Sequence, residues 1–97
     1  MISTVIIEDE PIFQELLKKT IAHSGLEIKI EGICNSKREA KKILPKVNPQ
    51  LIFLDVELTD GKGIDLLTEL GQVDFEIIFT TSHDKYAINA IKNNAAD

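Results

Sequence analysis

Apolar residues form four short segments along the chain, and the pattern within each one predicts a β-strand. The segments 3–7 ("STVII"), 50–54 ("QLIFL") and 75–81 ("FEIIFTT") are largely apolar runs. Runs of this length are typical of strands that are buried on both faces of a sheet. The segment 26–33 ("LEIKIEGI") alternates apolar and charged residues, which indicates a half-exposed strand near an edge of the sheet.

Apolar residues at helical spacing follow each of these strands. A first helix is expected from Pro11, which suits a first helical turn, to Gly25, which suits a helix end. A short third helix is expected over residues 64–70, with Asp60 before it as a capping residue and the glycines of the loop forming a turn. A fourth helix is expected over residues 84–95 ("DKYAINAIKNNA").

The second helix has the clearest start signal in the chain. Ser36 is followed three positions later by Glu39, which is the capping-box pattern that opens a helix. Because proline lacks a backbone N–H, Pro45 and Pro49 are expected to bring this helix to its end.

Strand and helix therefore alternate four times, which predicts a parallel sheet with right-handed crossovers and helices on both faces. All strands of a parallel sheet point the same way, so their carboxyl ends share one edge. Open α/β sheets place their ligand sites along that edge. The residues that follow each strand are thus the first candidates for function.

Composition limits the classes of function. The chain has 97 residues, 43% hydrophobic and 28% charged, which suits one globular domain. A net charge of −5 argues against non-specific nucleic-acid binding by this chain. A lone cysteine, Cys34, suits the reducing cytoplasm. No apolar run approaches the ~20 residues that span a bilayer, and no basic segment precedes the first one, so neither a membrane span nor a secretion signal is expected.

Acidic and hydroxyl side chains gather at the shared sheet edge. Glu8 and Asp9 follow the first strand, Asp55 follows the third, and Thr80 and Thr81 end the fourth. Like charges repel, so a hard divalent cation such as Mg²⁺, which prefers oxygen ligands, is expected among the carboxylates. A carboxylate beside Mg²⁺ can act as a nucleophile toward phosphorus, and Asp55 is the best-placed candidate. Thr81 is expected to hydrogen-bond a phosphoryl oxygen. Thr80 is expected to be a threonine only because threonine has a high β-propensity.

Three segments carry a resemblance to a known family. "VIIEDEP", "LIFLDVELTDGKGIDLL" and "IIFTTSHDKYAINAI" together resemble the receiver domain of bacterial two-component response regulators. The segment "FTTSHDKYA" is similar to the LytTR-type branch, whose members usually carry a DNA-binding domain after the receiver. The resemblance implies a flavodoxin-like (CheY-like) doubly wound α/β fold with strand order 2-1-3-4-5.

The resemblance also implies a role for each residue at the edge. It makes Asp55 the phospho-acceptor, Asp9 a direct Mg²⁺ ligand and Glu8 a ligand that acts through water. Glu57 matches the residue whose backbone carbonyl completes the metal site, and Thr81 matches the switch hydroxyl that turns toward the phosphoryl group. A sensor histidine kinase is the implied partner.

The resemblance ends before a complete receiver does. A fifth strand, a lysine at its start and a fifth helix would follow Asp97, so residues 1–97 are expected to be a receiver domain truncated at its carboxyl end, with strand order 2-1-3-4. Lys85 and Lys92 belong to the expected fourth helix and cannot replace that lysine. An uncovered fourth-strand edge would favour self-association, such as a homodimer.

These observations favour a phosphorylation-controlled switch that regulates transcription through a further domain, and not an enzyme that turns over a metabolite. One alternative is a pseudo-receiver that acts as a protein-interaction module without phosphorylation. Another is a phosphatase with an aspartyl nucleophile, although that class carries Asp-x-Asp on its first strand. Here the acid lies on the third strand, and the residue two positions after Asp55 is Glu57.

Overall fold

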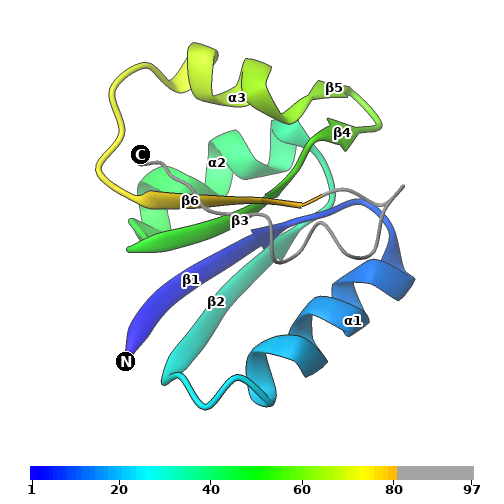
Figure 1. The fold of residues 1–97 in the computed structure, drawn as a ribbon. Helices are drawn as coiled ribbons and strands as arrows, with labels where there is room; N and C mark the ends of the chain where they lie inside the picture. Colours follow the sequence, from blue (N-terminus) through cyan, green and yellow to red (C-terminus); the bar gives the residue numbers. More distant parts are fainter. Residues whose placement is uncertain (81–97) are drawn as a thin grey trace.

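A four-stranded parallel sheet with helices on both faces organises residues 1–80, which are the residues that the computed structural model describes (Figure 1). The strand order is β2-β1-β3-β6, which is the predicted order 2-1-3-4 in terms of the long strands. The strands are β1 (Ile2–Ile7), β2 (Ile28–Cys34), β3 (Leu51–Asp55) and β6 (Glu76–Thr80), and the helices are α1 (Pro11–Ala22), α2 (Lys37–Val47) and α3 (Gly63–Leu70).

The sheet separates two apolar cores. On one face, β-strand residues such as Val5 and Ile52 pack with Leu44 of α2 and Leu66 of α3. On the other face, Ile6 and Phe53 pack with α1, as Figure 1 shows from the position of α1 on the opposite side of the sheet. Alternate residues of each central strand thus enter different cores, which explains why β1 and β3 are apolar at almost every position. As predicted from its alternation, β2 is an edge strand with a half-exposed pattern.

Helix α2 starts as the sequence predicts. Ser36 Oγ accepts a hydrogen bond from the backbone N–H of Glu39 at 3.0 Å, and Glu39 Oε1 accepts one from the N–H of Asn35 at 2.8 Å. It ends at Val47, between Pro45 and Pro49, in agreement with the prediction. Pro45 lies in the last turn, where a proline removes only one helical hydrogen bond, and the left-handed Asn48, with φ 52°, caps the helix end.

The loop before α3 differs from the prediction in two respects. Residues 56–63 contain a small antiparallel hairpin made of β4 (Glu57–Leu58) and β5 (Gly61–Lys62). Asp60 was expected to cap α3, but its two carboxylate oxygens accept hydrogen bonds from the backbone N–H groups of Lys37 and Arg38. Asp60 therefore caps α2, which is distant in sequence, while α3 begins without a side-chain cap.

The predicted fourth helix over residues 84–95 and the switch residue Thr81 lie outside the described residues. Within residues 1–80, no helix has the length and apolar character needed to cross a membrane.

The burial of α3 gives a direct test of the fold. Leu66 is fully buried, whereas Ile64 in the same helix is 52% exposed. We expect Leu66→Ala to lower the free energy of unfolding by about 2–5 kcal/mol, because it removes apolar contacts and leaves a cavity. Ile64→Ala should change it by about 0.5 kcal/mol or less. Urea unfolding measures both, and equal effects would contradict the observed orientation of α3.

Candidate metal and phosphoryl site

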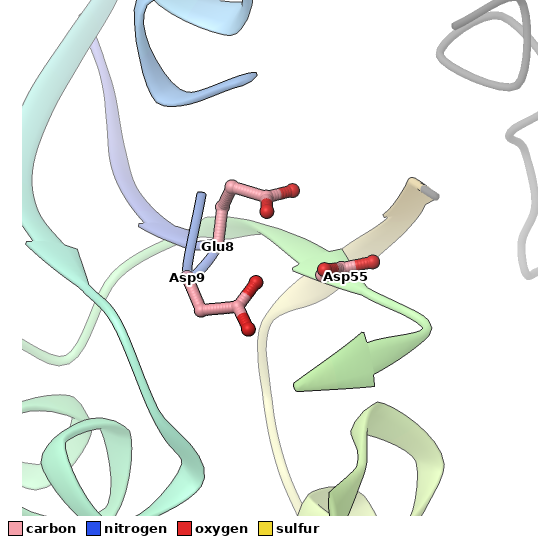
Figure 2. Close-up of side chains that lie close together, drawn as sticks. All are labelled: Glu8, Asp9 and Asp55. Carbon is pink, nitrogen blue, oxygen red and sulfur yellow. The ribbon is translucent and has the colours of Figure 1, made fainter. Parts of the chain in front are cut away.

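Three carboxylates meet at the carboxyl edge of the sheet. Asp55 is the last residue of β3, and Glu8 and Asp9 follow directly after β1, the adjacent strand. Each of the three offers an oxygen atom, and these atoms lie within 4.8 Å of one another. Figure 2 shows the side chains extending to the same side from the two strand ends. The sequence prediction that these acids converge is confirmed, although more than forty positions separate the two groups.

Strand register explains why Asp55 lies where it does. Ile7 pairs with Leu54 across β1 and β3, and Asp55 pairs with Thr80 across β3 and β6. Since side chains alternate along a strand, Asp55 lies on the same face as Phe53, above the core that packs on α1. The apolar layer of that core ends at Phe53, and the side chain of Asp55 lies beyond it at the carboxyl edge of the sheet.

Two of the three acids are deeply buried. Glu8 is 1% exposed and Asp55 is completely buried. One oxygen of each carboxylate accepts a backbone hydrogen bond: Glu8 Oε2 from Glu10 at 3.0 Å, and Asp55 Oδ1 from Glu57 at 3.3 Å. Asp55 Oδ2 has no hydrogen-bond partner within residues 1–80. A buried carboxylate oxygen without a donor is costly, so this atom indicates a site for a positively charged ligand.

Burial and mutual repulsion alter the acidity of the pair. The pKa of Glu8 is raised from 4.5 to about 8, chiefly by burial and also by the nearby charges of Asp55 and Asp9, while the hydrogen bond from the Glu10 N–H opposes the rise. Burial also raises the pKa of Asp55, although the hydrogen bond from the Glu57 N–H opposes this. Both groups therefore hold protons more tightly than usual unless a cation balances their charge.

The donor set suits Mg²⁺. Carboxylate oxygens in a small acidic cluster are the ligands that hard divalent cations prefer, and Asp55 Oδ2 is left without a donor. The side chain of Glu57 is exposed. Its backbone lies next to Asp55, because its N–H donates the hydrogen bond to Asp55 Oδ1. The predicted metal role of the Glu57 carbonyl stays a prediction.

Gly63 is a site residue whose role the sequence did not reveal. It was expected only to turn the chain. A Cβ atom added at this position would clash with the backbone oxygen of Asp55 and would lie 3.1 Å from Leu54 Cγ. Gly63 N–H also donates to the Val56 carbonyl at 2.7 Å. The start of α3 thus touches the backbone of the candidate nucleophile, and only glycine fits there.

Comparison with known proteins now places the chain in a family. Residues 4–97 match the response regulator receiver domain. The chain belongs to this family. An uncharacterized response regulatory protein of Vibrio cholerae is 34% identical over 98 residues, and the transcriptional regulatory protein BtsR of Escherichia coli is 32% identical over 101 residues. Each alignment covers all of this chain and 41% of the relative, so the chain spans about two fifths of the length of these relatives.

A solved receiver supports the same conclusion. The receiver domain of the PhyR response regulator from Erythrobacter litoralis is 31% identical, with a TM-score of 0.71 over 92% of this chain and 69% of that one. The flavodoxin-like fold predicted from the sequence is confirmed. Assignment to the LytTR-type branch stays a prediction.

Thr80 ends β6 beside Asp55 in this receiver. Its side chain is 3% exposed, and its hydroxyl has no hydrogen-bond partner within residues 1–80. The sequence attributed this threonine to β-propensity alone. Thr80 adds a second buried polar atom without a partner, on the strand next to Asp55.

The close contact at Gly63 predicts a local and severe effect of substitution. Gly63→Ala should lower the free energy of unfolding by about 1–3 kcal/mol, because the added methyl group meets backbone atoms that cannot move independently. Gly71→Ala, at a glycine with open space around it, is a demanding control because its φ of +78° also disfavours alanine. We expect chemical-shift changes around Asp55 in Gly63→Ala but not in Gly71→Ala, which would separate a steric contact with Asp55 from general backbone strain. Unchanged chemical shifts around Asp55 in Gly63→Ala would contradict the contact.

Receiver stability should depend on pH through Glu8. Because its pKa is raised in the folded state, the folded chain binds more protons than the unfolded chain between pH 4.5 and about 8. Its contribution to stability is present below about pH 4.5 and is lost as the pH rises toward about 8. In EDTA, the free energy of unfolding should therefore fall over this range, and less so in Glu8→Gln. An equal decline in both proteins would contradict the assignment.

Proposed function

We propose that Asp55 of this receiver accepts a phosphoryl group from a partner histidine kinase in a Mg²⁺-dependent reaction, and that this switches the output of the protein. The observation that carries the proposal is the buried Asp55 Oδ2, which lacks a donor and lies beside the carboxylates of Glu8 and Asp9. In the transfer, an Asp55 oxygen forms a bond to phosphorus. The bond between phosphorus and the kinase histidine nitrogen breaks, and its electron pair stays on that nitrogen.

Each acid has a separate task in this proposal. Asp9 and Asp55 hold Mg²⁺ directly, Glu8 acts through water, and the Glu57 backbone carbonyl completes the site. The metal ion, when bound, neutralises the charge that accumulates between the carboxylates and the phosphoryl group. The chain's own contribution is position: the end of β3 fixes Asp55, and the Glu57 N–H binds its Oδ1, which leaves the buried Oδ2 without a donor beside Glu8 and Asp9.

The output is proposed to be regulation of transcription by a further part of the protein. BtsR of Escherichia coli is a transcriptional regulatory protein, and a net charge of −5 makes this chain itself a poor ligand for nucleic acid. We propose that Thr81 is the switch hydroxyl, that the protein is cytoplasmic, and that it turns over no metabolite. Pairing of two copies through the outer edge of β6 stays a prediction.

Labelling with a small phosphoryl donor such as acetyl phosphate tests this proposal. We expect Mg²⁺-dependent incorporation in the wild-type chain and none in Asp55→Asn, which removes the nucleophilic oxygen while keeping the size of the side chain. Asp74→Asn is the matched control, because Asp74 is exposed and precedes β6 at the opposite end of the strands. Intact mass spectrometry in the presence and absence of EDTA measures incorporation.

Three outcomes would contradict the proposal in different ways. Labelling that persists in Asp55→Asn would place the acceptor elsewhere. An absence of labelling in the wild-type chain would favour a protein-interaction module. Sustained hydrolysis of a phosphomonoester would favour the phosphatase alternative.

A further inference from the structure

The loop that follows Asp55 is held at its base and in its middle. Residues 56–63 leave β3 and return to α3, and the Gly63 N–H closes the base on the Val56 carbonyl at 2.7 Å. Glu57 pairs with Lys62 in the small hairpin. Leu58 is 8% exposed and belongs to the core on the α2 and α3 face. These contacts explain the path of the loop but leave its tip to be accounted for.

The tip is fixed by Asp60. Its Oδ1 accepts a hydrogen bond from the Lys37 N–H at 2.9 Å, and its Oδ2 accepts one from the Arg38 N–H at 3.1 Å. These are the first two residues of α2, whose N–H groups have no partner within the helix. The bond from Lys37 chiefly lowers the pKa of Asp60, as expected for a carboxylate at the positive end of a helix dipole.

The Lys37 side chain makes a second connection at the same place. A Cβ atom added to Gly61, at the tip, would lie 2.9 Å from Lys37 Cε. Lys37 Nζ also forms an ion pair with Glu69 Oε2 of α3 at 3.0 Å, and Lys41 pairs with the other oxygen of Glu69. The loop tip, the start of α2 and the end of α3 therefore meet around one lysine.

We propose that Asp60 is a positioning residue for the site at Asp55: by fixing the loop tip to α2, it holds the Glu57 backbone against the Asp55 carboxylate. Glu57 lies only three residues from Asp60, and its N–H is the donor to Asp55 Oδ1. Release of the tip would free these residues to sample other conformations, and the Glu57 carbonyl would lose its fixed position. The part of this inference that concerns Mg²⁺ rests on the proposed function.

The cap of α2 supplies a matched control. Ser36 caps the same helix through the Glu39 N–H, but Ser36 makes no hydrogen bond to the loop among the contacts of residues 1–80. Ser36→Ala should therefore weaken the start of α2 without releasing the loop. Asp60→Ala removes both loop bonds, while Asp60→Asn keeps one acceptor oxygen and should fall between Asp60→Ala and the wild type.

Two measurements on the folded chain test the inference. Amide hydrogen exchange without metal should be about tenfold faster at Glu57 in Asp60→Ala, if the lost bonds contribute about 1.4 kcal/mol to holding the loop. Calorimetric titration with Mg²⁺ should show affinity weakened by about tenfold, the lower end of the range for residues that orient metal ligands. Ser36→Ala should leave both values at the wild-type level, and Asp60→Asn should give partial rescue.

Equal effects of Ser36→Ala and Asp60→Ala would overturn the inference, since the stability of α2 alone would then explain them. Unchanged exchange at Glu57 in Asp60→Ala would overturn it as well. A wild-type chain that binds no Mg²⁺ would contradict the proposed function instead, and the exchange experiment would still decide whether Asp60 holds the loop.

Discussion

The structure depends on one electrostatic constraint, the burial of the Asp55 carboxylate at the end of a central strand. The backbone of β3 is paired on both sides, by β1 and β6, so the carboxylate cannot move out into water without breaking the sheet. One of its oxygens has a single long hydrogen bond, and the other has none within residues 1–80. Such an arrangement is unfavourable for the ionised carboxylate, and it makes a cation or a proton favourable there.

The surrounding chain is arranged to keep this unfavourable group in place. Parallel pairing brings Glu8 and Asp9 to the same edge, and the charge of Asp9 raises the pKa of Asp55 further. Gly63 permits α3 to begin in contact with the Asp55 carbonyl, and Leu58 anchors the intervening loop in the core. An unfavourable buried group persists at a functional site only when neighbouring contacts hold it in place. The hairpin, the core anchor and the Asp60 cap supply such contacts within a few residues.

Much of this could be predicted from the sequence, because strand burial and helix capping leave local signals. The apolar runs located β1 and β3, and alternation marked β2 as an edge strand. Once the strands were known to be parallel, convergence of the acids followed from geometry alone. The partner of Asp60 could not be predicted in this way, because a capping residue more than twenty positions from its helix leaves no local pattern. Gly63 was likewise ambiguous, since a turn and a close backbone contact select the same residue.

The same contacts link the site to one face of the sheet more than to the other. Asp55 faces the core that packs on α1, but the loop that follows it packs its Leu58 side chain into the opposite core, and its tip is bound to α2. A shift of the Glu57 backbone must therefore be absorbed either within the short hairpin or at the Asp60 contacts with α2. Because packed cores resist continuous deformation, the Leu58 anchor favours a shift at the tip over one in the core. The ion pair between Lys37 and Glu69 is a surface contact of a kind that stabilises a fold only modestly, so it can rearrange without unfolding the domain.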